Sequence, residues 1–387
     1  FPQYDYGLHT DAVTIADMLR GRGYATGCFG KWHLGHRPGL LPLDQGFDEY
    51  VGVPYSNDMA QIHRKPNNKY LYRLPLMNGD AVVEWEPDQR LLTKRYTDAT
   101  VDFIERHQDE PFFAYVPHSM PHIPLYASAD FEGKSPRGLY GDVIEEIDWS
   151  VGQITQTLDR LGLSDNTLIV FMSDNGPWLP FKRNGGSAGL LRGGKGSNWE
   201  GGQRVPCIAK WPARIPKNQV CREVATTMDM LPTLAAITGS ELSKQRPIDG
   251  HDVRDLLFGR AAAKSKTEHF LYYTSKGDLH GIRRGPWKLK LKPLELFQIE
   301  HDVSEQWDVK KQNQALVAEL KDLAVALDAE ITAAARPTRG APRMRRRARA
   351  CSATLADLAS TACAARCAAA GSRRSLADPG FCRCDSE

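Results

Sequence analysis

Apolar residues follow two spacings along the first part of the chain, one typical of amphipathic helices and one typical of short buried strands. Residues 91–107 carry apolar side chains at helical spacing and lead into residues 112–116, a continuous apolar run. The same order recurs where the helical pattern of 142–161 precedes the apolar run 167–172. Short strands that are apolar throughout are typical of parallel strands covered by helices on both faces. The pattern therefore predicts an α/β fold with a largely parallel central sheet.

Three further segments extend this order of helices and strands. Residues 13–19 form a short apolar stripe for which Thr10 is the predicted N-cap, and residues 24–29 form the strand that follows. Residues 222–239 predict another helix of the core. The polar residues with candidate chemistry follow the predicted strands, where the loops of such sheets carry ligand sites.

The pattern changes in the last third of the chain. Residues 281–297 contain short runs that predict antiparallel strands, and residues 316–331 predict one amphipathic helix. We therefore expect a catalytic domain at 1–265 and a small C-terminal α+β subdomain at 266–333. Residues 334–387 are rich in Ala and Arg and lack a period of large apolar residues, so we expect a disordered or non-native tail.

Charge is distributed unevenly along the 387 residues, whose net charge is +3. The tail contains eleven arginines, no lysine and four acidic residues, so the residues before it are slightly acidic. That balance does not indicate a nucleic-acid-binding face. No apolar run approaches the length of a membrane span. We expect neither nucleic acid nor a membrane as a partner.

Two basic residues follow the predicted strand 24–29. Lys31 and His33 are separated by one residue, so both side chains project from the same face if strand geometry continues through Trp32. Lysine supplies fixed positive charge, and histidine can move a proton near neutral pH. Together they suit an anionic substrate. An isolated pair of this kind is more often a surface lysine beside a packed histidine, so the surrounding residues carry the argument.

Those residues, Gly-Tyr-x-Thr-x-x-x-Gly-Lys-x-His-x-Gly, resemble the second signature of the type I sulfatases. Residues 189–206 closely resemble the family's segment GGKGxxxEGGxRVP. The resemblance runs from Gly7 to Ile331, and within the family the chain most resembles the arylsulfatase A and N-acetylgalactosamine-6-sulfatase branch. It implies an alkaline-phosphatase-like sandwich and the hydrolysis of sulfate monoesters.

The resemblance also implies the members of the site. The implied sulfate-binding residues are Lys31, Ser56, His122 and Lys195. His33, together with Lys31, is the implied catalytic residue and assists the breakdown of the covalent intermediate. His118 lies near His122, but the position before Ile-Pro matches His122. Without the resemblance, Ser56 would be read as part of a structural turn.

Asp174 and Asn175 offer an anionic and a neutral oxygen just past a predicted buried strand. Hard cations such as Ca²⁺ prefer oxygen ligands of this kind. A plain turn is the alternative for an isolated Asp-Asn-Gly. In the sulfatases this segment supplies two of the calcium ligands, so the resemblance implies a Ca²⁺ site that is incomplete in this chain.

The family's first signature, Cys/Ser-x-Pro-x-Arg, does not occur in the sequence. In the family it carries the formylglycine nucleophile, which we expect to lie upstream, so that this chain is an N-terminally truncated fragment without turnover of its own. The alternatives are another alkaline-phosphatase-superfamily hydrolase, such as a phosphodiesterase, or a non-catalytic anion-binding fragment. The resemblance implies a sulfated small molecule or glycan as partner and a secreted, periplasmic or lysosome-like location.

Overall fold

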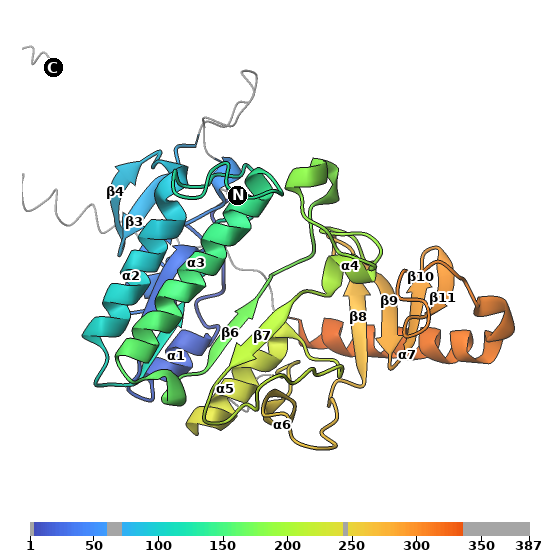
Figure 1. Ribbon diagram of the computed structural model, residues 1–387. Coiled ribbons are helices and arrows are strands. Elements are labelled where there is room, and N and C mark those ends of the chain that lie inside the picture. Colours follow the sequence, from blue (N-terminus) through green and yellow to red (C-terminus); the bar gives the residue numbers. More distant parts are fainter. Residues whose placement is uncertain (1–3, 60–71, 243–246, 336–387) are drawn as a thin grey trace, which may run out of the picture. The chain divides into compact units, whose positions relative to one another are not determined.

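A computed structural model describes residues 4–59, 72–242 and 247–335 (Figure 1). The helices are α1 (Ile15–Arg20), α2 (Leu92–Arg106), α3 (Leu139–Arg160), α4 (Glu200–Gln203), α5 (Met230–Thr238), α6 (Arg254–Leu257) and α7 (Gln314–Ala334). The strands are β1 (Ala25–Lys31), β2 (Glu49–Val53), β3 (Pro75–Asn78), β4 (Ala81–Trp85), β5 (Phe112–Tyr115), β6 (Ile169–Met172), β7 (Cys207–Lys210), β8 (His269–Tyr273), β9 (Leu279–Arg284), β10 (Trp287–Leu291) and β11 (Leu294–Gln298). The predicted tail lies almost wholly outside the described residues.

Strand β1 is the centre of the principal sheet, whose order is β4-β3-β2-β1-β5. It pairs in parallel with β2 and with β5, while β3 and β4 extend the sheet in antiparallel pairing. Strands β6 and β7 form a separate antiparallel pair. The predicted α/β fold is confirmed, with parallel pairing around β1 and antiparallel strands that the sequence pattern did not predict.

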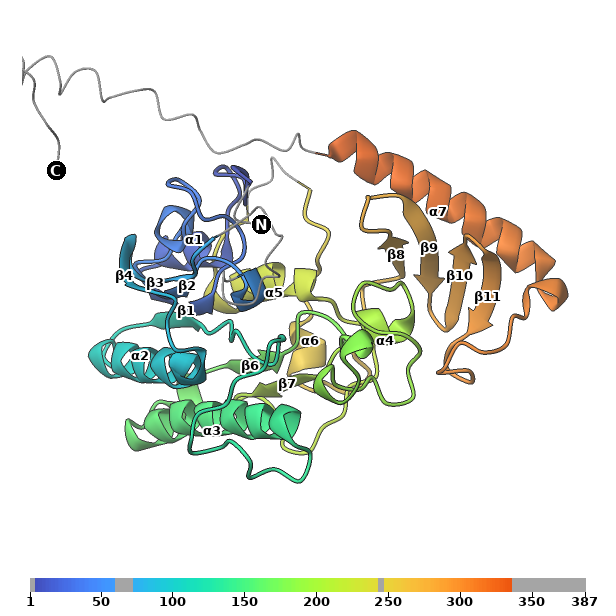
Figure 2. The ribbon, with the colours of Figure 1, turned by 90° about the horizontal axis from the view of Figure 1, so that it is seen from above.

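Helices cover both faces of the principal sheet (Figure 2). On one face, Phe29 of β1 packs against Phe103 and other apolar residues of α2, beside which α3 lies. On the other face, Cys28 packs in a cluster with Ala16 of α1, and α5 packs on α1. Because successive strand residues point to opposite faces, a continuous apolar run is what burial on both faces requires.

Two predicted helix starts were wrong. The N-cap of α1 is Thr14, not Thr10, because the Thr14 hydroxyl accepts the Asp17 amide and the Asp17 carboxylate accepts the Thr14 amide. The helix predicted at 222–239 begins as α5 at Met230, after a short 3₁₀ turn, η7 (Thr227–Asp229).

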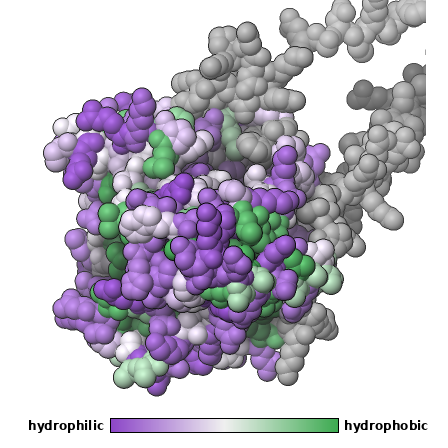
Figure 3. Space-filling view, turned by 90° about the vertical axis from the view of Figure 1, so that its right-hand side faces the viewer, coloured by the Kyte–Doolittle hydropathy of each residue, from purple (hydrophilic) through white to green (hydrophobic). Residues whose placement is uncertain are grey.

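The C-terminal elements form a second sheet, in the order β11-β10-β9-β8, with every pair antiparallel. Helix α7 packs along it through Leu320 and Ala324, which meet Ile282, Leu289 and Leu296 in a fully buried cluster (Figure 2). Hydrophilic side chains dominate the surface viewed from this side (Figure 3). Among the described residues, no helix has both the length and the apolar character needed to cross a membrane.

Candidate active site

Lys31 is the last residue of β1, and the backbone around it is held on both sides. Its amide donates to Pro117 O at 2.7 Å, and the amide of Trp32 donates to Val53 O at 3.0 Å. Gly30 makes this close approach possible, because a Cβ at that position would lie 2.1 Å from Pro117 O. The ends of β1, β2 and β5 therefore fix the backbone position from which the Lys31 side chain extends.

His33 reaches the site by a route that the sequence did not predict. The strand ends at Lys31, and His33 has a φ of 58°, in the left-handed region, so strand geometry does not continue through Trp32. A non-glycine residue there costs about 1–3 kcal/mol and persists only where the surroundings hold it. The His33 amide donates to Pro54 O at 3.1 Å. The two residues are neighbours in the site because the chain turns, not because they share a strand face.

The imidazole of His33 is electrically neutral near pH 7. Partial burial and then the positive charge of Lys31 lower its pKa to about 4, and the positive charge of His122 acts in the same direction. The negative charge of Asp58 opposes this shift. A neutral imidazole can accept a proton but adds no standing positive charge.

His122 and Lys195 meet at Trp178. The His122 ring centroid lies 5.3 Å from that of Trp178, and Lys195 Nζ lies 5.0 Å from the same indole centroid. His122 Nδ1 is 2.7 Å from Ile123 O, so Nδ1 carries the proton and donates it to this bond. Burial, together with the charges of Lys195 and Lys31, lowers the pKa of His122 against that hydrogen bond.

His118 differs from His122 in its surroundings. The residue is partly buried, its buried Nδ1 has no hydrogen-bond partner, and burial alone lowers its pKa to about 4. The charges of Lys31 and Lys195 act on His122 and not on His118. Of the two histidines, His122 shares an environment with the lysines.

Both signs of charge lie where these residues meet. Burial lowers the pKa of Lys31 most, the negative charge of Asp174 raises it, the positive charge of Lys195 lowers it, and Asp58 raises it. The Lys31 cation is thus held with less solvation than it would have in water. An anion that contacts Lys31 and Lys195 would make up for part of that lost solvation.

Ser56 lies just before the short turn η2 (Asn57–Met59). It is buried, and its hydroxyl oxygen has no hydrogen-bond partner. Asn57 fixes the turn, because its Nδ2 donates to Gln89 Oε1 at 2.9 Å and to Pro124 O at 3.1 Å. Within the described residues, the structure does not bring Ser56 into hydrogen-bonding contact with the candidate lysines and histidines.

Asp174 and Asn175 follow β6, in a turn where the Ser173 hydroxyl donates to Asn175 O at 2.9 Å. The charge of Asp174 acts on Lys31, so this turn borders the same site. Carboxylate and amide oxygens fit a hard cation. The described residues nevertheless contain no group of three or more His, Cys, Asp or Glu side chains placed to hold a metal. They therefore offer two oxygen ligands of the six to eight or so that Ca²⁺ takes.

The sequence did not predict two further residues of this site, Asp58 and Trp178. Asp58 acts on Lys31, His33 and His122 at once. Trp178 contacts both His122 and Lys195. Neither carries a local signal, because an acid in a turn and a tryptophan after Asn-Gly-Pro are common in loops.

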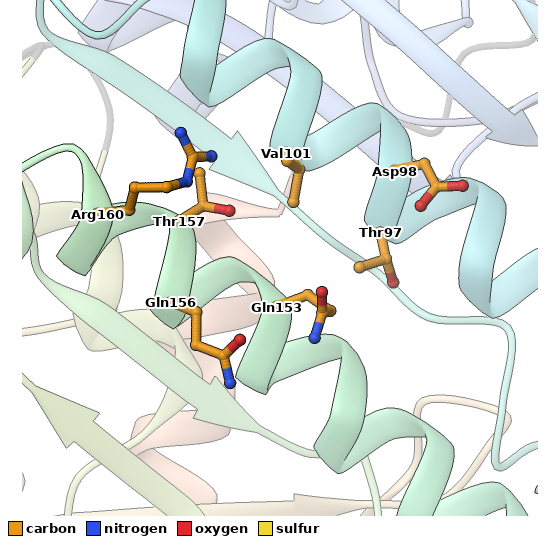
Figure 4. A pocket seen from close by; sticks show the side chains of 7 residues that line it. All are labelled: Thr97, Asp98, Val101, Gln153, Gln156, Thr157 and Arg160. Atoms are coloured by element: carbon orange, nitrogen blue, oxygen red, sulfur yellow. The ribbon is translucent and has the colours of Figure 1, made fainter.

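Two cavities differ in their relation to the candidate site. One of about 350 Å³ lies between α2 and α3, is lined by residues such as Thr97, Gln153 and Arg160, and includes none of the candidate residues (Figure 4). The other, of about 320 Å³, is lined by His33, His36, Tyr55 and Tyr6, among others. Only the second adjoins the candidate site.

Comparison with known proteins identifies the family. The family model described as Sulfatase matches residues 2–240, more than half of the chain. The chain belongs to the Sulfatase family. It is 36% identical over 301 residues to arylsulfatase A of Homo sapiens, covering 73% of this chain and 59% of that protein. It is 39% identical over 290 residues to N-acetylgalactosamine-6-sulfatase of Sus scrofa, covering 73% and 55%.

Solved structures agree with this membership. The crystal structure of Ps i-CgsB in complex with k-i-k-neocarrahexaose matches with a TM-score of 0.72 and 30% identity, over 84% of this chain and 76% of that chain. A second solved structure, described under the metabolism of multiple glycosaminoglycans by Bacteroides thetaiotaomicron, has a TM-score of 0.70 and 27% identity, over 84% of both chains. The predicted family and sandwich fold are confirmed. The chain spans only 59% and 55% of the length of the two curated relatives named above.

Proposed function

We propose that this chain forms the sulfate-binding part of an enzyme that hydrolyses sulfate monoesters. The observation that carries the proposal is the convergence of Lys31, Lys195, His33 and His122 from separate segments onto one partly desolvated site. Membership of the Sulfatase family supports the same conclusion.

Each basic residue has a separate task in this proposal. Lys31 and Lys195 neutralise charge on the sulfuryl oxygens, an effect that is strong where water is excluded. His122 donates Nδ1–H to Ile123 O, so Nε2 faces the anion, and in the protonated ring Nε2–H donates to a sulfate oxygen. His33, being neutral, can accept a proton during the breakdown of the covalent intermediate, the step that the family resemblance assigns to it. Asp174 and Asn175 would hold Ca²⁺, which would add positive charge beside Lys31.

The residues of this site bind and polarise an ester but include no attacking group. The sequence contains no Cys/Ser-x-Pro-x-Arg, the motif in which the family resemblance places the formylglycine nucleophile. We therefore propose that attack on sulfur requires a group beyond these 387 residues.

The alcohol half of the substrate has a candidate place in the cavity of about 320 Å³ that His33 borders. Its lining combines the ring-bearing residues His36, Tyr55 and Tyr6 with the apolar residues Leu8, Leu34 and Pro54. A relative acts, by its name, on N-acetylgalactosamine 6-sulfate, and a structural neighbour is a complex with k-i-k-neocarrahexaose. We propose a sulfated saccharide as the substrate, met in a secreted, periplasmic or lysosome-like location.

Titration of the protein with sodium sulfate, followed by isothermal calorimetry, tests the binding step. We expect one sulfate site that is lost in the double variant Lys31→Met/Lys195→Met and kept in Lys94→Met. Lys94 is a suitable control because it lies on the surface of α2, paired with Asp98 at 2.7 Å. Absence of sulfate binding by the unaltered protein would show that the proposal is wrong.

A further inference from the structure

A buried network of charges lies outside the sulfate site, between α4 and the C-terminal sheet. Lys288 Nζ of β10 lies 2.9 Å from Glu200 Oε1 and 2.7 Å from Glu305 Oε1. All three side chains are at most 1% exposed. Tyr272 OH donates to Glu200 Oε1 at 2.7 Å, and Arg283 Nη1 lies 3.2 Å from Glu200 Oε2. Two carboxylates and two cations thus balance inside the protein.

This network is attached to both ends of the glycine-rich loop 190–200, which carries Lys195. At the far end, the Glu200 amide donates to Glu305 Oε2 at 2.7 Å. At the near end, Arg192 Nη1 donates to Glu305 O at 2.7 Å, and the Ser304 hydroxyl donates to Leu190 O at 2.6 Å. The segment around Glu305 therefore clamps the start and the end of the loop.

Helix α4, which begins at Glu200, connects the network to the rest of the site. The Gly201 amide donates to Arg192 O at 2.8 Å, and the Gly176 amide donates to Gly202 O at 3.2 Å. Gly176 follows the Asp174-Asn175 pair directly. A Cβ at Gly176 would lie 1.8 Å from Gly201 O, so the two backbones are in close contact. A shift of α4 would move the Lys195 loop and the Asp174 turn together.

Stability alone does not account for such a network. Replacing a buried ion pair or triad with well-packed apolar residues is often neutral or stabilising, because burying the charges costs nearly as much as their attraction returns. The ionic network instead restricts the geometry of the groups it joins, because each hydrogen bond forms only over a narrow range of distance and angle. The loop it holds is rich in glycine. The middle of the loop has hydrogen bonds of its own, from the Lys195 amide to Pro177 O at 2.8 Å and from the Ser197 hydroxyl to Gly194 O at 2.7 Å, so the network acts on the two ends of the loop.

We propose that Glu200, Lys288 and Glu305 are positioning residues that hold the loop 190–200, so that Lys195 lies at the anion site. The C-terminal sheet then contributes to sulfate binding by holding this loop, although none of its residues contacts the sulfate. The expected effect of these residues on sulfate affinity rests on the proposed function. Their expected effect on the conformation of the loop is independent of that function.

The test compares Lys288→Met with Tyr272→Phe and with Arg284→Met. Lys288→Met removes the central cation. Tyr272→Phe removes one hydrogen bond and keeps the ring, so it remains informative if the stronger variant fails to fold. Arg284→Met is the matched control, because Arg284 also lies in the C-terminal sheet but pairs with the exposed Glu319 of α7, at 2.8 Å.

Amide hydrogen exchange of residues 189–203 and calorimetric sulfate affinity are measured for each variant. Lys288→Met should speed exchange in this loop and weaken sulfate binding, each about tenfold or more. Tyr272→Phe should change both by about two- to fivefold, because it loses a single hydrogen bond. Arg284→Met should change neither. Unchanged loop exchange in folded Lys288→Met, or in Tyr272→Phe if the former does not fold, would overturn the inference.

A network without charges separates positioning from stability. In Glu200→Leu/Arg283→Leu/Lys288→Met/Glu305→Leu, which leaves no charge of the network without its partner, we expect the thermal midpoint to recover toward the unaltered value while sulfate affinity stays low. Sulfate affinity equal to that of the unaltered protein would overturn the inference. If the unaltered protein binds no sulfate, the proposed function fails, and loop exchange alone then decides whether the network positions the loop.

Discussion

Replacing Lys31 with Met should weaken sulfate binding and at the same time stabilise the sulfate-free protein. Met keeps the length and the apolar character of the lysine stem and removes the charge. Burial holds the pKa of Lys31 below its ordinary value, and the negative charge of Asp174, opposed by Lys195 and aided by Asp58, offsets this only in part. Because the folded state disfavours the charged form at this position, removing the charge relieves an unfavourable interaction.

The two effects differ in size. A hydrogen bond to a charged group contributes about 1.5–3 kcal/mol, so losing the bond from Lys31 to sulfate should raise Kd about 10- to 150-fold. The gain in unfolding free energy should be about 1 kcal/mol, or about 2 °C in the midpoint of a domain of this size. The gain should shrink as the pH rises toward the ordinary lysine value of 10.5, because folded Lys31 loses its proton before unfolded Lys31 does.

Two calorimetric measurements check this prediction. Isothermal titration with sodium sulfate gives Kd, and differential scanning calorimetry in sulfate-free buffer gives the midpoint. Lys94→Met is the control, since it removes an exposed lysine from α2 and should change the midpoint and Kd little. Equal sulfate affinity in Lys31→Met, or a lower midpoint without sulfate, would refute the electrostatic reasoning.

Three other predictions follow from the sequence and the structure. The 387-residue chain should show no turnover of an aryl sulfate, with or without calcium, because it lacks the Cys/Ser-x-Pro-x-Arg motif; sustained multiple turnover by contaminant-free protein would contradict this. Between pH 6.5 and about 4, unfolded His118 binds more protons than folded His118, so acid should lower the unfolding free energy by about 1–3 kcal/mol through this residue. In denaturant unfolding, His118→Gln should lose less unfolding free energy than the unaltered protein when the pH falls from 6.5 to 4. An identical pH profile for the two proteins would contradict this role of His118. Removal of residues 336–387, beyond α7, should leave the thermal midpoint unchanged, because their composition offers few large apolar side chains to bury; a midpoint several degrees lower would show that they pack on the body.

The parts of the fold that local pattern determines could be predicted from the sequence. Helices α2 and α3 follow from apolar residues at helical spacing, and β1, β5 and β6 follow from short apolar runs. The start of α5 could not be predicted, because it depends on a distant contact as well as a local one. Asp229 accepts the Thr226 amide at 2.6 Å and the His251 amide at 2.7 Å, and both bonds are satisfied only if the helix begins after it.

The candidate site divides in the same way. The residue types and the string around Lys31 pointed to an anion site, but the reason given for pairing Lys31 with His33 was wrong, since His33 adopts a left-handed conformation. Glu200 belongs to the glycine-rich segment that resembles the family, but nothing marked its partner Lys288, 88 residues away along the chain. Spacing along the chain carries information about neighbours within one element, whereas a buried ion network is visible only once the elements have packed.

The two lysines of the site depend on different kinds of support. Lys31 is held by strand hydrogen bonds at the end of β1, where the backbone is flanked by β2 and β5. Lys195 lies on a glycine-rich loop whose ends are tied to the segment around Glu305. Substitutions in the C-terminal sheet should therefore alter sulfate affinity through Lys195 and leave the pKa of Lys31 and its surroundings nearly intact, apart from the repulsion that Lys195 itself contributes. A variant such as Lys288→Met should in consequence lose affinity mainly by faster sulfate dissociation, because a mobile Lys195 still draws the anion toward the site but no longer holds it there.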